Sequence, residues 1–186
     1  MANRDELDDP TVPAWVDGVL RPVGKRRVHL DGLRHMAVSV FVVDDGDVTT
    51  GAPRLLLQRR ALSKYHTPGL WANACCTHPK WGEDPGACAV RRLREELGVT
   101  GLDLSRMSKV EYRADVGGGM TEHEVVDIFV ARAGPDLPIA PDPDEVAGTR
   151  WMALPDLDTE IAAEPDRFAP WLRIYLSEHR SAILRG

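Results

Sequence analysis

The sequence predicts a single α/β (α+β) domain in which a mixed β-sheet is covered by helices. Short apolar runs rich in valine and leucine, typical of strands, are interspersed with two segments of helical periodicity. The chain has 186 residues, of which 43% are hydrophobic, so it can bury one substantial core and has little room for a second. The elements lack the regular strand–helix alternation of a doubly wound fold, and this favours a mixed sheet.

The first part of the chain contains an acidic segment and two apolar runs. Residues 1–13 have little to bury, so we expect a mobile arm there and the folded domain over residues 14–186. His35–Asp44 (HMAVSVFVVD) is rich in valine, and Arg54–Gln58 is a second apolar run after the turn-rich residues 46–53. The pattern predicts two paired strands.

The segment from Asp84 to Gly98 (DPGACAVRRLREELG) carries the clearest helical signals. Asp84 is a capping residue, a proline follows at the first helical position, and Gly98 closes the segment. Apolar side chains recur at helical spacing, at Ala87, Val90, Leu93 and Leu97. We therefore expect a helix that begins after Asp84 and ends before Gly98.

The last third of the chain predicts more strands and a closing helix. Lys109–Ala114 and Glu124–Ala131 resemble strands on either side of a turn at three glycines, residues 117–119, and Thr149–Ala153 resembles another short strand. Residues 165–184 have an amphipathic pattern that predicts one helix. Its apolar side consists of Phe168, Trp171, Leu172, Tyr175 and Leu176.

Composition excludes several classes of function. The chain has three cysteines, a formal net charge of −6, an acidic start and no run of about 20 apolar residues. Adjacent Cys75 and Cys76 have poor geometry for a disulfide, which suits a reducing compartment. We therefore expect a cytoplasmic, monomeric protein that interacts with neither a membrane nor nucleic acid.

Histidines and glutamates form a candidate metal site. His29 and His35 flank a turn at residues 31–32, and His78 lies in the irregular segment 68–83. In a strand, alternation puts Glu122 and Glu124 on one face, where their charges repel unless a cation or a proton intervenes. Three imidazoles and two carboxylates suit Mn²⁺, Mg²⁺ or Zn²⁺ with one position left open. The alternative is a set of surface histidines beside an exposed, acidic edge strand.

Basic residues form a candidate anion site. In the predicted helix Arg91 and Glu95 are four residues apart, as are Arg92 and Glu96. Both pairs are compatible with surface ion pairs. For the second pair the alternative is that Glu96 binds a Mg²⁺ ion while Arg92 contacts a phosphate group. Arg60 and Lys64 lie in a basic cluster after a strand, where they either grip a diphosphate or are simply solvated.

The chain resembles the type I isopentenyl-diphosphate isomerases of the Nudix superfamily. The segments that carry the resemblance are KRRVHLDGLRH, LLLQRRALSK, PGLWANACCTHP, VRRLREELGV, YRADVGGGMTEHE, DEVAGTRW and FAPWL. The resemblance implies a Nudix-type mixed sheet sandwiched between helices. It also implies the metal-dependent conversion of isopentenyl diphosphate to dimethylallyl diphosphate in isoprenoid biosynthesis, by addition of one proton and removal of another.

The resemblance also implies residue roles. Cys76 and Glu124 resemble the catalytic pair, assisted by Tyr112. Trp171 resembles the aromatic wall beside the hydrocarbon, and Glu96 resembles the ligand of a second Mg²⁺ that arrives with the diphosphate. The metal ligands would be His29, His35, His78, Glu122 and Glu124, and the diphosphate would be held by Lys25, Arg60, Lys64 and Arg92.

Two other functions are compatible with the same residues. A Nudix diphosphohydrolase would share the helix motif, but it carries a glutamate where this chain has Arg92, and losing that carboxylate weakens the metal cluster that activates water. A catalytically silent metal- or ligand-binding domain would not need the acid–base pair. The direction of proton transfer between Cys76 and Glu124, and the metal used in the cell, are left open at this point.

Overall fold

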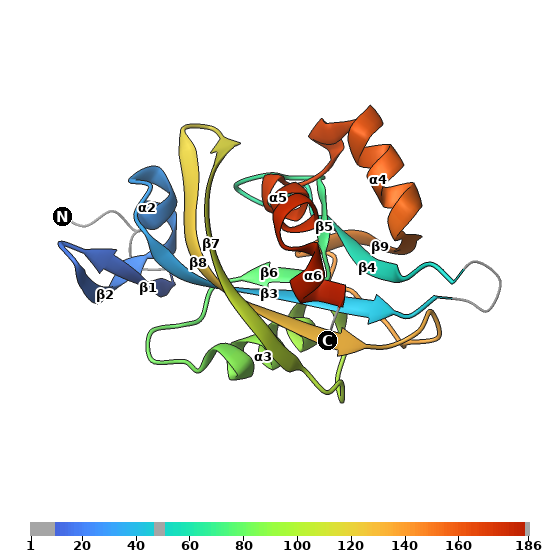
Figure 1. Cartoon of the computed structure of the whole chain (residues 1–186). Helices are drawn as coiled ribbons and strands as arrows, with labels where there is room; N and C mark the ends of the chain where they lie inside the picture. The colour runs from blue at the N-terminus through green and yellow to red at the C-terminus, as the bar shows by residue number, and fades with distance from the viewer. Residues whose placement is uncertain (1–9, 47–50, 185–186) are drawn as a thin grey trace.

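The computed structural model of the chain describes residues 10–46 and 51–184 (Figure 1). The strands are β1 (Thr11–Val16), β2 (Val19–Gly24), β3 (His35–Asp44), β4 (Arg54–Arg60), β5 (Trp71–Asn73), β6 (Cys75–Thr77), β7 (Ser105–Gly117), β8 (Met120–Arg132) and β9 (Val146–Ala153). The helices are α2 (Lys25–Leu30), α3 (Pro85–Leu97), α4 (Leu154–Ala163), the 3₁₀ turn η1 (Pro165–Arg167), α5 (Pro170–Glu178) and α6 (Arg180–Leu184).

Strand β3 lies at the centre of a mixed sheet. It pairs in parallel with β8 along nine residues, from His35 opposite Glu124 to Val43 opposite Arg132. It also pairs antiparallel with the short β6, where Ser39 lies opposite Cys76. The predicted mixed sheet is therefore confirmed, and its register brings His35, Cys76 and Glu124 onto neighbouring strands.

Helices cover both faces of this sheet, as Figure 1 shows. On one face, residues of α4, α5 and α6 pack with Phe41 and Val43 of β3. On the other face, α3 packs against Val40 and Val42 of the same strand. Because alternate side chains of β3 enter two different cores, the strand is apolar along nearly its whole length instead of alternating with polar residues.

Most of the predicted elements are confirmed. The strand expected at His35–Asp44 has those bounds, and the strands expected at 54–58, 109–114, 124–131 and 149–153 lie within β4, β7, β8 and β9. In α3 the Asp84 carboxylate accepts hydrogen bonds from the amides of Gly86 and Ala87, and Gly98 ends the helix at a φ of 65°. These caps involve neighbours in sequence, so local signals were sufficient to predict them.

The single helix predicted over residues 165–184 is wrong. The segment consists of η1, α5 and α6, because Phe168 is extended and forms a parallel bridge with Trp71. The amide of Ala169 donates to the Trp71 carbonyl at 2.9 Å, which a continuous helix would not allow. The predicted apolar side is nevertheless correct, since all five of its residues are buried.

Two other expectations need correction. The arm predicted over residues 1–13 lies mostly outside the described residues, but Thr11 to Pro13 belong to β1, and Val12 is buried. The ordered domain therefore begins before residue 14, because β1 can pair with β2 along its full length. The segment 68–83, expected to be irregular, contains the short strands β5 and β6. Helices α2 and α4 were not predicted.

Within residues 10–46 and 51–184, no helix is both long and apolar enough to cross a membrane.

Replacement of Asp84 by alanine should lower the free energy of unfolding by about 1 kcal/mol, because two amides at the start of α3 lose their acceptor. Urea denaturation would measure the change. Asp166→Ala is the control, since that residue is exposed and also lies in a helical first turn. Equal stability of the two variants would contradict the capping role.

Candidate active site

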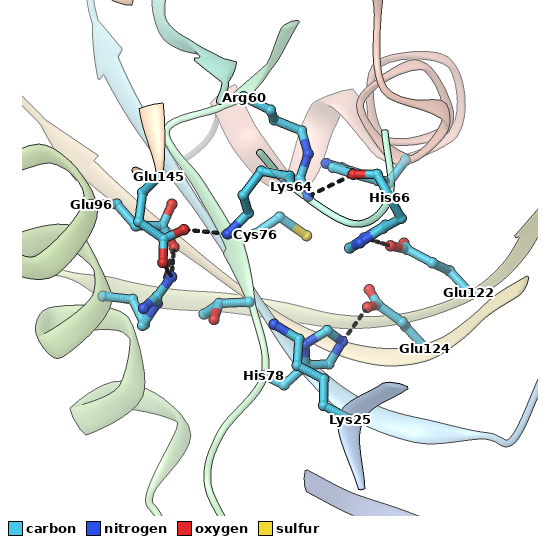
Figure 2. Close-up of a pocket in the computed structure, with 13 residues that line it drawn as sticks. Lys25, Arg60, Lys64, His66, Cys76, His78, Glu96, Glu122, Glu124 and Glu145 are labelled. Carbon is cyan, nitrogen blue, oxygen red and sulfur yellow. Dashed lines mark hydrogen bonds and ion pairs between the residues drawn. The ribbon is translucent and has the colours of Figure 1, made fainter. Parts of the chain in front are cut away.

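A pocket lies where the ends of several strands meet α3 and α5 (Figure 2). Its walls come from segments far apart in the sequence, and they combine cationic, acidic, imidazole and thiol groups. The lining residues are Lys25, Arg60, Lys64, His66, Cys76, Thr77, His78, Arg92, Glu96, Glu122, Glu124, Glu145 and Trp171.

Three predicted histidines form a compact buried cluster, of which His78 lines this pocket and the other two lie behind it. His29 comes from α2, His35 begins β3, and His78 follows β6, with ring centroids 4.9 to 5.2 Å apart. The Nε2 atoms of His35 and His78 are 3.1 Å apart, and Glu124 Oε1 lies 2.8 Å from His78 Nε2. Because these histidines are buried, the interpretation as surface histidines is wrong.

The hydrogen bonds of the cluster leave nitrogen lone pairs turned inward. The Nδ1–H of His29 donates to the Lys25 carbonyl at 2.6 Å, and that of His35 donates to the Leu33 carbonyl at 2.7 Å. Such bonds fix the tautomer and leave Nε2 as the acceptor. Nε2 of His29 is buried and finds no hydrogen-bond partner among the described residues. A buried acceptor without a partner is rare, and this arrangement fits a bound metal ion.

Burial keeps most of these rings neutral near pH 7. It lowers the pKa of His29 to about 4 and lowers the pKa of His78 well below its usual value. Burial also acts to lower the pKa of His35, but the Glu124 carboxylate outweighs it and the pKa is raised. Burial acts to raise the pKa of Glu124, whereas His35 and Tyr112 together bring it below its usual range. The cluster therefore offers neutral imidazoles beside an ionised carboxylate, which is the donor set of a divalent metal.

The two glutamates of β8 point into the site together. Glu122 and Glu124 are both almost fully buried, whereas His123 between them lies on the opposite face and contacts Glu111. Tyr112 lies opposite Glu124 on β7, and its hydroxyl is 2.5 Å from Glu122 and 2.7 Å from Glu124. The shared face is confirmed, and the alternative of an exposed acidic edge is wrong.

Cys76 is placed in the same pocket by the pairing of β6 with β3. Figure 2 shows its sulfur pointing into the pocket. Burial, and then the charges of Glu124 and Glu122, raise the pKa of Cys76 well above its usual value. The residue is therefore a thiol near pH 7, able to donate a proton, and becomes a base only when it has given that proton up.

Cations line the opposite side of the pocket. Lys64 forms an ion pair with Glu145, and Arg92 Nη2 lies 2.6 Å from Glu96 and 3.2 Å from Glu145. Lys25 has no ion pair with any described residue, and its pKa is lowered by burial and then by the charges of Lys64 and Arg92. This side of the pocket therefore has more cationic than acidic side chains, although the lining as a whole has four of each.

Two other predicted residues stand beside these cations. Arg60 stacks over Trp171 at 5.3 Å from the ring centroid, and its guanidinium donates to the carbonyls of His66 and Thr67. Glu96 is buried and also accepts from Gln58 at 2.9 Å. The Arg92–Glu96 pair is therefore not a surface ion pair, whereas Arg91 and Glu95 form a more exposed pair at 2.9 Å.

Three residues that line the pocket were not predicted from the sequence: His66, Thr77 and Glu145. Nε2 of His66 lies 3.0 Å from Glu122, and the carboxylate of Glu145 contacts two of the predicted cations. His66 lies two residues after Lys64 in the same segment, and Glu145 belongs to the DEVAGTRW segment that carried part of the resemblance. Neither residue was assigned a role, because closeness to a site residue in the sequence does not show which side chains reach the pocket.

The chain is similar to known proteins along nearly its whole length. A family model described as NUDIX domain matches residues 33–172. The isopentenyl-diphosphate Delta-isomerase of Cereibacter sphaeroides is 62% identical over 172 residues, which cover 92% of this chain and 93% of that protein. The protein of the same name from Rhodobacter capsulatus is 57% identical over 177 residues, which cover 95% of this chain and 97% of that protein.

A solved structure supports the same fold. The MutT NUDIX hydrolase from Burkholderia pseudomallei is 25% identical, with a TM-score of 0.58, over 78% of this chain and 98% of that one.

Adding Mn²⁺ or Mg²⁺ to chelator-treated protein should raise the midpoint of thermal unfolding. An ion that binds only the folded state stabilises it by about 2.7 kcal/mol at roughly a hundred times its dissociation constant. The rise should be much smaller in Glu124→Gln, because a neutral amide replaces a carboxylate that lies among three imidazoles. Calorimetry would measure both, with His123→Ala as a control from the other face of β8. An equal rise in Glu124→Gln would exclude that residue as a ligand.

Proposed function

The chain belongs to the Nudix superfamily and, within it, to the isopentenyl-diphosphate Delta-isomerases, and we propose that it converts isopentenyl diphosphate to dimethylallyl diphosphate in isoprenoid biosynthesis. The observation that carries the proposal is the content of one pocket. It holds a thiol, Cys76, and a carboxylate, Glu124, next to cations suited to a diphosphate. A carbon–carbon double bond can be moved by two such groups if one donates a proton and the other removes one.

The chemistry requires both groups and a pocket shielded from water. An isolated alkene is a weak base, so an acid must be held close to its terminal carbon. Protonation at C4 leaves a tertiary cation at C3, and loss of a proton from C2 then gives dimethylallyl diphosphate. We propose that Cys76 and Glu124 carry these two transfers and that Tyr112, which contacts Glu124 at 2.7 Å, holds that carboxyl group in place.

We propose that one divalent ion is held by His29, His35, His78, Glu122 and Glu124. This set is supported by the convergence of buried imidazoles on Glu124 and by the unpartnered Nε2 of His29. Mn²⁺ or Mg²⁺ suits these ligands, and Zn²⁺ can also bind them. When bound, the ion would supply positive charge that offsets the negative charges of the two carboxylates.

We propose that the diphosphate is held by Lys25, Arg60, Lys64 and Arg92, and that Glu96 binds a second Mg²⁺ that arrives with the substrate. Burial of Glu96 beside Arg92 supports this part of the proposal. Trp171 offers the carbocation an aromatic wall that cannot trap it, an interaction worth on the order of 2 kcal/mol when desolvated. The substrate would thus lie with its charged end at α3 and its hydrocarbon end between Cys76 and Glu124.

Arg92 favours the isomerase over a diphosphohydrolase built on the same fold. It stands where a Nudix hydrolase carries a glutamate, and here its guanidinium lines the pocket and contacts Glu96. A positive charge at this position suits the binding of phosphate oxygens and removes one ligand for the ions that activate water.

We further propose that the protein acts in the cytoplasm as a monomer.

Incubation of the protein with isopentenyl diphosphate in D₂O should give dimethylallyl diphosphate with deuterium in a methyl group and release no inorganic phosphate. The reason is that the proton added at C4 comes from a group that exchanges with solvent. Deuterium NMR and a phosphate assay on one sample would measure both. Release of phosphate without deuterium in the carbon chain would support the hydrolase instead.

Cys76→Ala should lower kcat by about 10²- to 10⁴-fold, the usual contribution of a general acid or base, while metal content stays the same. Steady-state kinetics and elemental analysis would test this. Cys88→Ala is the control, because that cysteine belongs to α3 and is buried in the core, outside the pocket. Turnover in Cys76→Ala equal to that of the control would remove Cys76 from the mechanism.

A further inference from the structure

The connection between β4 and β5 closes over the imidazole cluster. Tyr65 Oη lies 3.5 Å from His29 Nδ1, and the ring of the adjacent His66 is 5.2 Å from the ring of His29. The backbone of this connection is held by Arg60, which donates to the carbonyls of His66 and Thr67 at 3.1 and 3.2 Å. His66 therefore occupies a defined, buried position facing β8 (Figure 2).

The hydrogen bond of His66 has one chemically sensible direction. Its Nε2 lies 3.0 Å from Glu122 Oε1, a carboxylate oxygen that accepts from an imidazole N–H, so Nε2–H is the donor. The Nε2 of His78 differs, because besides its contact with Glu124 it faces the Nε2 of His35 at 3.1 Å within the imidazole cluster. The His66 ring then carries its other lone pair on Nδ1, which is buried and finds no hydrogen-bond partner among the described residues. The Glu122 carboxylate is within 2.5 Å of the Tyr112 hydroxyl through its other oxygen. Glu122 thus contacts His66 through one oxygen and, through the other, a tyrosine hydroxyl that it shares with Glu124.

His66 belongs to a second group of potential ligands that shares a member with the first. The larger group contains His29, His35, His78 and Glu124, and the smaller group contains His29, His66 and Glu122. His29 can offer only Nε2, because its Nδ1 donates to the Lys25 carbonyl. A nitrogen lone pair binds one ion. Once His29 and Glu122 serve the proposed ion, the smaller group retains only His66, which cannot hold a second ion alone.

We propose that His66 is a positioning residue that orients Glu122 toward the metal ion by donating a hydrogen bond to it, without itself ligating the ion. This inference rests on the proposed metal site. A hydrogen bond from outside the ligand set limits the rotation of a carboxylate and fixes which oxygen faces the metal. Glu122 Oε1 is occupied by His66, so His66 and Tyr112 together determine how the carboxylate meets the ion.

The metal affinity of His66→Ala should fall by about 10- to 100-fold, the usual effect of losing a hydrogen bond to a metal ligand. Mn²⁺ titration of the chelator-treated full chain would measure the affinity. His66→Gln should retain affinity close to that of the wild type, because its amide N–H can reach the same carboxylate oxygen. His123→Ala is the control, since it removes a histidine from the opposite face of β8.

Spectra of the Co²⁺-loaded proteins distinguish a positioning residue from a ligand. The visible bands should keep the same positions in His66→Ala as in wild type, since the number of nitrogen ligands does not change. Altered bands would show that His66 is itself a ligand and would overturn the proposal. Unchanged Mn²⁺ affinity in His66→Ala would also overturn it. So would an affinity in His66→Gln that is as low as in His66→Ala. Because these measurements use no substrate, they are independent of the D₂O assay that tests the isomerase activity.

Discussion

The parallel pairing of β3 with β8 is the interaction on which the site depends. It places His35 opposite Glu124, and the antiparallel pairing of β6 with the same strand adds Cys76. A one-residue shift in the β3–β8 register would turn Glu122 and Glu124 away from the imidazoles, because side chains alternate between faces. The register is held by two cores at once, since β3 contributes apolar side chains to both faces. The chemistry is therefore fixed by the same packing that stabilises the domain.

The electrostatics of the pocket divide it into two halves. At one end, buried imidazoles and carboxylates converge with little water to screen them. At the other end, Lys25 stands near Lys64 and Arg92, and repulsion among these cations contributes to its lowered pKa. Cys76 lies between the halves, where Figure 2 shows its sulfur. A ligand that is anionic at one end matches the cationic half, and Trp171 offers an aromatic surface to its other end.

Features set by neighbours in sequence could be predicted from the sequence, and features set by distant contacts could not. The caps of α3 were predictable because Asp84 and Gly98 act on adjacent backbone groups. The break at Phe168 was not, because it is caused by pairing with Trp71. Alternation along β8 was sufficient to place Glu122 and Glu124 on one face. The presence of His66 beside Glu122 depends on how the β4–β5 connection folds over the site, which no local pattern encodes.

The ion pairs that line the pocket also bear on which anions can bind. Lys64 and Arg92 are each engaged by Glu145, and Arg92 is engaged by Glu96 as well. An anion that binds these cations breaks their ion pairs and leaves the two carboxylates without a counter-charge. Sulfate or free phosphate brings no positive charge to replace the one that is lost. A diphosphate that carries its own Mg²⁺ brings the missing positive charge. Under the proposed function, the paired carboxylates would favour a metal-chelated diphosphate over simple anions such as sulfate or free phosphate.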